Sequence, residues 1–176
     1  AQNSYKVNLR VTTPGGSSKY YSQTVRGKDH LVAVMGDSFA SGEGVPDSGF
    51  AKNGVPVNWV DKRCHRSNRS GPALAAHALE AADPHTSVTF ISFACSGATI
   101  RRHTPEGQGI LGPYEGIEKP NDVAPRLPAQ VDQLHFAVGG SRPRAIDSLL
   151  MIGGLHDIEF PPFMLGCVVR RGGANR

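Results

Sequence analysis

The chain has 176 residues, of which 39% are hydrophobic and 19% are charged, and its formal net charge is +4. This length fits one globular domain, and the composition excludes a disordered chain. No apolar run approaches the roughly 20 residues that a membrane-spanning helix needs. Lys and Arg are scattered, with no basic stripe interleaved with aromatic residues. The sequence therefore does not favour a nucleic-acid-binding protein.

The N-terminal segment predicts a β-hairpin. Residues 5–11 alternate in polarity, a stretch rich in Gly and Ser follows, and residues 19–25 form a second extended run. We therefore divide the chain into an N-terminal extension, residues 1–28, and a main domain, residues 29–176.

The chain starts at Ala1 without an initiator Met, as a secreted protein does after loss of its signal peptide, although a cloned fragment would start the same way.

Strands and helices alternate along the main domain. Short apolar or β-branched runs predict strands at residues 31–35, 87–93 and 145–152, and helix formers predict helices at residues 72–82 and from Pro128 onward. Segments rich in Gly and Pro predict long loops at residues 42–62 and 103–128. Such alternation is typical of an α/β fold with a parallel sheet, whose sites lie beyond the carboxyl ends of the strands. Three strands are too few to complete a doubly wound layer.

The three cysteines are Cys64, Cys95 and Cys167. Their spacing lacks the paired C-x-x-C elements of a structural zinc site, so the sequence favours a disulfide and gives no metal site. An odd number leaves one sulfur as a free thiol or bonded to a partner outside the chain.

Ser38 lies in the segment Gly36-Asp37-Ser38-Phe39-Ala40, directly after the first buried strand. A serine at this place can present its hydroxyl and its N–H to the crevice at the end of the sheet, because Gly36 lets the backbone bend tightly. Ser38 is therefore the candidate nucleophile. The alternative for this short motif is a serine that only caps a helix.

Three segments together resemble the SGNH, or GDSL-like, hydrolase superfamily, and in particular its secreted actinobacterial lipases and esterases. They are the Ser38 segment, residues 93–99 with the sequence F-A-C-S-G-A-T, and residues 151–160 with M-I-G-G-L-H-D-I-E-F, and residues 64–67 (C-H-R-S) followed by residues 72–75 (P-A-L-A) extend the match. The resemblance covers about residues 31–170. It implies a flavodoxin-like three-layer α/β/α fold, a Cys64–Cys95 disulfide, no cofactor, and an oxyanion donor in the N–H of Gly97.

The third segment departs from the family pattern at His156. The family has Asn at this position, and its side-chain amide donates to the oxyanion. An imidazole N–H can also donate, so we expect His156 to take the same role. The alternative is that His156 is an ordinary loop residue.

The general base of the family, a His in a C-terminal D-x-x-H motif, has no counterpart after the third segment. Asp132 and His135 fit the spacing, but they precede the third segment and lie in a predicted helix, where the family has no catalytic residues. In the related lipases a cysteine at the place of Cys167 pairs with one further along the chain. We therefore expect a second polypeptide segment, disulfide-bonded through Cys167, that supplies the base and completes the sheet.

These features predict a secreted, or alternatively periplasmic, serine ester hydrolase with Ser38, Gly97 and His156 at its site. The substrate is an ester of either a lipid or an acetylated carbohydrate, because the two predicted loops do not distinguish them. The alternative function is a non-catalytic relative that binds a carbohydrate or a surface. A third and weaker hypothesis is a nucleic-acid-binding protein, whose binding would depend steeply on salt concentration.

Overall fold

The computed structural model describes residues 2–49, 56–100, 109–121, 123–141 and 143–173. Within them the fold is α/β, with an open mixed sheet. The strands are β1 (Gln2–Thr12), β2 (Ser18–Gly36), β3 (Thr86–Ser92) and β4 (Ser148–Ile152). The helices are α1 (Ser38–Ser41), α2 (Gly71–Ala81), α3 (Gln130–Val138) and α4 (Phe160–Gly173). Residues 50–55 and 103–108 of the two expected loops lie outside the described residues, as do residues 101 and 102.

Strand β2 is the centre of the sheet. Its residues from Lys28 to Val34 pair in parallel with β3, and those from Val32 to Gly36 pair in parallel with β4. Its N-terminal half pairs antiparallel with β1, from Ser18 to Lys28. The predicted parallel arrangement of the three main-domain strands is thus confirmed, and the hairpin makes the whole sheet mixed.

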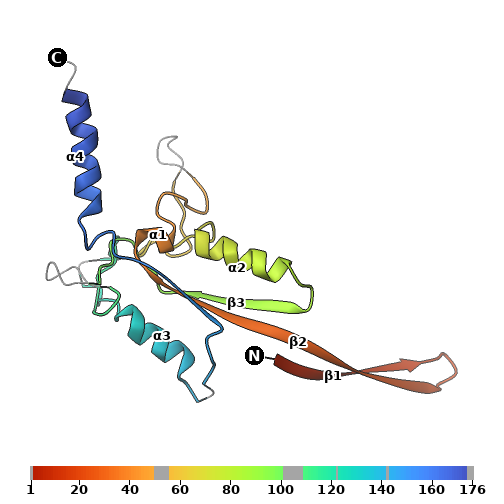
Figure 1. Cartoon of the computed structure of the whole chain (residues 1–176). Coiled ribbons are helices and arrows are strands. Elements are labelled where there is room, and N and C mark those ends of the chain that lie inside the picture. The colour runs from red at the N-terminus through yellow and green to blue at the C-terminus, as the bar shows by residue number, and fades with distance from the viewer. Residues whose placement is uncertain (1, 50–55, 101–108, 122, 142, 174–176) are drawn as a thin grey trace.

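Helices cover both faces of the main-domain sheet (Figure 1). One face packs Ala33 and Met35 of β2 against Leu134 of α3. On the opposite face Val34 packs with Ala40 and Ala94, and α2 lies over β3. The apolar run from Leu31 to Met35 has both faces covered in this way, which is why it shows no polar alternation.

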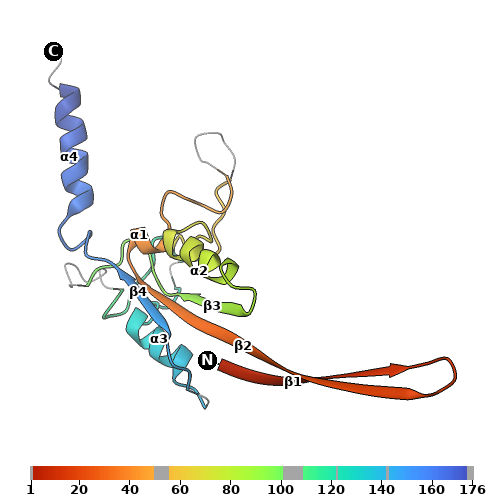
Figure 2. The ribbon, with the colours of Figure 1, turned by 45° about the vertical axis from the view of Figure 1, so that its right-hand side comes forward.

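The predicted N-terminal hairpin is confirmed, but its second strand is not separate from the main domain. Strand β2 runs for 19 residues from the hairpin into the core. Figures 1 and 2 show the hairpin as an arm that extends away from the helices. We call residues 2–27 the arm. Lys28 pairs with both β1 and β3, so β2 runs without a break across the expected boundary between residues 28 and 29.

The main helices lie close to their predicted places. Helix α2 begins one residue before the expected start, because the Ser70 side chain caps it by accepting from the Ala73 N–H. Helix α3 begins at Gln130, two residues after Pro128. The last strand is shorter than expected and begins at Ser148 instead of Ala145. Helix α4 was not predicted, and it projects away from the sheet (Figure 1).

Candidate active site

The three segments that carry the resemblance meet at the carboxyl ends of three adjacent strands. Asp37 follows β2, Cys95 follows β3 and Leu155 follows β4. The N–H of Cys95 donates to the Gly36 carbonyl at 3.1 Å, and the N–H of Asp37 donates to the Ile152 carbonyl at 3.0 Å. The sheet therefore brings together residues that lie more than 50 positions apart in the sequence, at the edge where α/β proteins bind ligands.

Asp37 joins the first and third segments. Its side chain is fully buried, and its carboxylate accepts from the N–H of Phe39 at 3.1 Å and from the N–H of Leu155 at 3.3 Å. The first bond caps α1 at its N-terminus. The aspartate thus holds the start of α1 against the loop after β4.

Ser38 is the first residue of α1 and is partly exposed. It lines an open hollow of about 230 Å³ together with Phe39, Gly42, Glu43, Val45 and Gly71. Among the described residues its N–H has no hydrogen-bond acceptor. The serine can therefore be reached from solvent, with a backbone donor beside its hydroxyl.

Gly97 occupies a backbone position that only glycine adopts easily. Its φ is +79°, and a Cβ there would collide with the hydroxyl of Tyr114. Tyr114 is buried, donates to the Ser96 carbonyl at 2.9 Å, and has its pKa raised by that burial. The Gly97 N–H, like that of Ser38, has no acceptor among the described residues.

His156 lies in the loop after β4 and is partly buried. Its imidazole makes no hydrogen bond or ion pair with another described residue, so its expected donation to an oxyanion stays a prediction. The neighbouring Asp157 has a defined place, because its carboxylate accepts from the N–H of Ile100 at 3.0 Å and 3.1 Å. These bonds join the residue directly after the second segment to the third segment.

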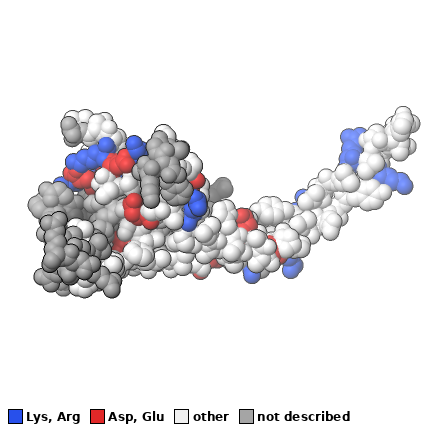
Figure 3. All heavy atoms as spheres, turned by 90° about the horizontal axis from the view of Figure 1, so that it is seen from above, with Lys and Arg blue, Asp and Glu red and all other residues white. Residues whose placement is uncertain are grey.

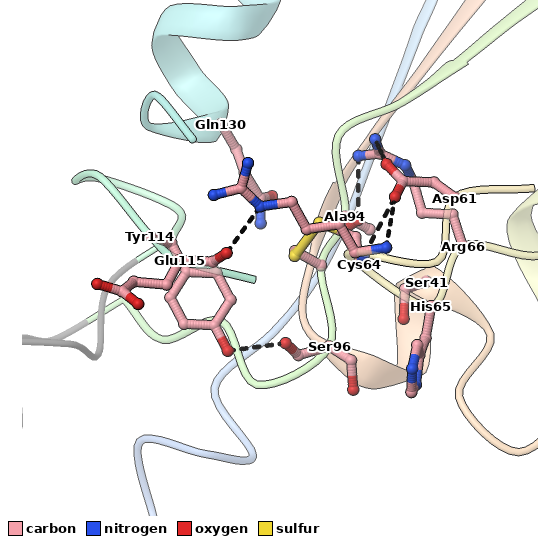
Figure 4. Close-up of a disulfide and its surroundings, with 12 residues drawn as sticks. Ser41, Asp61, Cys64, His65, Arg66, Ala94, Ser96, Tyr114, Glu115 and Gln130 are labelled. Carbon is pink, nitrogen blue, oxygen red and sulfur yellow. Dashed lines mark hydrogen bonds and ion pairs between the residues drawn. A yellow bond between two sulfur atoms is a disulfide. The ribbon is translucent and has the colours of Figure 1, made fainter. Parts of the chain in front are cut away.

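The Cys64–Cys95 disulfide, which the resemblance implied, is present and buried. Figure 4 shows the groups that surround it. On one side Arg66 pairs with Asp61 and donates to the Ala94 carbonyl, and on the other Tyr114 reaches Ser96. The disulfide therefore fixes the loop before α2 against the segment that contains Gly97.

Gln130 was not recognised in the sequence as a site residue. It is the first residue of α3 and is buried. Its carboxamide accepts from the Gly36 N–H at 2.7 Å and donates to the Gly36 carbonyl at 2.9 Å. Gly36 needs this partner at the point where the chain turns from β2 into α1, where a Cβ would collide with the Ile152 carbonyl. Only the packing of α3 reveals this contact.

His65, which lies in the C-H-R-S segment of the resemblance, is a second group to which the sequence gave no role at the site. Its Nδ1 lies 2.7 Å from a Glu43 oxygen and its Nε2 lies 2.9 Å from a Glu118 oxygen, while its ring stacks on Trp59. Hydrogen bonds from His65 and Lys62 lower the pKa of Glu118. Because Glu43 lines the hollow at Ser38, this cluster fixes one wall of that hollow.

Among the described residues the Ser38 hydroxyl has no hydrogen-bond partner that could act as its general base, and the Glu43 carboxylate in the same hollow is paired with His65. Both ring nitrogens of His65 are engaged by carboxylates. Asp132 and His135 lie on the exposed side of α3, in a hollow that shares no lining residue with the Ser38 hollow. The described residues also contain no cluster of His, Cys, Asp or Glu that could hold a metal ion.

Comparisons with known proteins add no family to this geometry. No protein-family model matches the chain, and no curated protein and no solved structure gives a significant match.

Proposed function

We propose that the chain is the nucleophile-bearing part of a secreted serine ester hydrolase with an SGNH-like, flavodoxin-type fold. The observation that supports this most is the meeting of the three motif segments at one edge of the parallel sheet. Hydrogen bonds from Cys95 to Gly36, from Asp37 to Ile152 and from Leu155 to Asp37 join them. A chance resemblance of short motifs would not require them to be neighbours in space.

In the proposed reaction the Ser38 hydroxyl attacks an ester carbonyl while its proton passes to a base. The tetrahedral intermediate then expels the alcohol, which takes that proton, and an acyl group remains on Ser38. Water attacks the acyl-enzyme in a second step and releases the acid. Two-step acyl transfer of this kind requires neither a metal nor an organic cofactor.

The oxyanion of each intermediate would be stabilised by the N–H groups of Ser38 and Gly97 and by the imidazole of His156. Backbone donors without an internal acceptor suit this role, because they are oriented before the charge forms. One such donor contributes about 3–4 kcal/mol to barrier lowering.

The base would come from a second polypeptide segment bonded to Cys167. Two features support such a partner. Cys167 is a free, exposed thiol on α4. Strand β4 and helix α4 also expose large apolar side chains that a further layer would cover, namely Leu149, Met151, Ile152, Phe163, Met164 and Leu165.

A secreted location fits the buried disulfide, because such bonds persist in oxidising compartments. No helix in the described part of the chain is long and apolar enough to cross a membrane. The substrate is proposed as an ester of a lipid or of an acetylated carbohydrate.

A fluorophosphonate probe tests the proposal on protein purified without reductant. We expect the probe to label Ser38 covalently, and we expect Ser38→Ala to lose both labelling and ester hydrolysis. The matched control Ser22→Ala, on the arm, should keep both. Unchanged hydrolysis in Ser38→Ala would refute the assignment. A folded protein that never reacts with the probe would instead support the non-catalytic binding alternative.

Intact mass under non-reducing conditions tests the second segment. We expect extra mass that reductant removes, and loss of that mass in Cys167→Ser. Full esterase activity of a chain with a free Cys167 thiol would contradict the proposed source of the base.

A further inference from the structure

The arm is a two-stranded ribbon with two chemically different faces. Opposite residues of β1 and β2 share a face, because their pairing is regular from Gln2 and Lys28 to Thr12 and Ser18. The two partners of each pair can therefore be assigned together. One face, which we call the apolar face, carries Tyr5, Val7, Leu9, Val11, Tyr21 and Val25, with Gln23 opposite Val7 and Lys19 opposite Val11 at the turn end.

The apolar face is exposed along its length. Leu9 is 57% exposed and Val7 is 53% exposed, and the other four apolar side chains of this face are at least 41% exposed. The register shows no bulge between Ser18 and Val34, so this face continues the side of β2 that α3 covers in the main domain. No described element covers it in the arm, and a two-stranded ribbon alone is marginally stable in water.

The opposite face is polar and basic. It carries Lys6, Arg10 and Arg26 among Ser, Thr and Asn residues, and the guanidinium of Arg10 lies 5.6 Å from the centre of the Tyr20 ring. Residues 2–27 contain no Asp or Glu, and a fourth cation, Lys19, lies near the turn at the end of the apolar face, opposite Val11. On the face seen in Figure 3 the outer arm accordingly shows Lys and Arg without acidic residues.

We propose that the arm docks on an anionic lipid surface. The apolar face would enter the boundary between headgroups and acyl chains, as amphipathic elements do to a depth of about 5–10 Å. The ribbon is one sheet thick, so the basic face would then lie at the level of the lipid phosphates. Tyr5 and Tyr21 have the apolar ring and polar tip that are typical of membrane interfaces.

Charge is what selects a lipid surface over a second copy of the arm. Two arms stacked through their apolar faces would bring eight cations into one assembly with no arm carboxylate to balance them. Anionic headgroups supply that balance, at roughly a fivefold gain in binding for each Lys or Arg near the surface. The inference depends on the arm alone and does not require Ser38 to be a nucleophile.

Vesicle sedimentation tests the proposal on the whole protein. We expect binding to vesicles of phosphatidylglycerol and phosphatidylcholine, weaker binding as salt increases, and little binding to phosphatidylcholine alone. Replacing both Val7 and Leu9 by Gln should weaken binding at least tenfold. The matched control, Asn8→Gln with Ser22→Gln on the basic face, should leave binding unchanged. Lys6→Gln with Arg10→Gln should weaken it by about 25-fold.

Three results would overturn the proposal. One is no binding to anionic vesicles by a protein whose circular dichroism shows it to be folded. Another is binding that the Val7 and Leu9 replacements do not change, which would place the contact elsewhere. The third is a concentration-dependent dimer that these replacements abolish and that binds no vesicles, which would make a second copy the occupant.

Discussion

The two halves of β2 have the same backbone conformation and very different surroundings. In the arm the strand pairs with β1, and its side chains are largely exposed. In the main domain it pairs with β3 and β4, and the five residues from Leu31 to Met35 are buried on both faces. Both halves have backbone hydrogen bonds to neighbouring strands, but only the main-domain half is buried. Burial should therefore determine which half of the strand resists local unfolding.

Hydrogen exchange should show the largest difference between the two halves. Amides in the arm part, such as those of Tyr21 and Val25, can open without disturbing the core, whereas those of Val32 and Val34 require the main domain to unfold. For a domain of ordinary stability we expect the core amides to exchange about 10³-fold more slowly or beyond. Equal protection along β2 would show that the arm is covered by a partner in solution.

The disulfide should stabilise the main domain and leave the arm unchanged. Cys64 and Cys95 are 31 positions apart, and closing a loop of this length stabilises the folded state by about 3–4 kcal/mol in the chain-entropy model. We expect Cys64→Ala with Cys95→Ala to lower the free energy of unfolding by about this amount, as measured by urea denaturation. Trypsin should cleave the arm at Arg10 and Lys19 at the same rate in this variant as in the unchanged protein, under conditions where the main domain of both is folded.

A matched pair of valines in β2 isolates the effect of burial. Val34 is fully buried and Val25 is exposed on the arm. Val34→Ala removes buried methyl groups and leaves a cavity, which should cost about 2–3 kcal/mol. Val25→Ala should cost less than about 0.5 kcal/mol. Similar losses for the two variants, measured by urea denaturation, would contradict the division that we draw within the strand.

The smallest expected effect concerns Glu118, whose folded-state pKa is lowered by His65 and Lys62. A lowered pKa contributes stability above the unfolded value of 4.5, and that contribution disappears as the pH falls through the folded-state pKa. Since the side chain is partly exposed, Glu118→Gln should cost no more than about 0.5 kcal/mol at pH 7. Thermal melts should show this difference shrinking below pH 4.5. A stability difference between the two proteins that grows as the pH falls would contradict a lowered pKa for Glu118.

The sequence by itself determined the local elements of this protein. Alternation in residues 5–11, followed by a turn-rich stretch and the extended run 19–25, predicted the hairpin. The run from Leu31 to Met35 predicted a strand buried on both faces, because its pattern depends only on side-chain direction along a strand. The motif resemblance implied the disulfide before any geometry was known. It also named Ser38, Gly97 and His156, whose roles at an oxyanion stay predictions.

The tertiary structure alone decided how the elements connect and which distant groups meet. The hairpin and the core strand are one continuous strand, because β2 pairs with β1 along one edge up to Lys28 and with β3 along the other edge from Lys28 onward. Gln130 on Gly36 and Glu118 on His65 are 94 and 53 positions apart in the sequence. Contacts of this kind arise from packing of whole elements, which no local pattern of residues encodes.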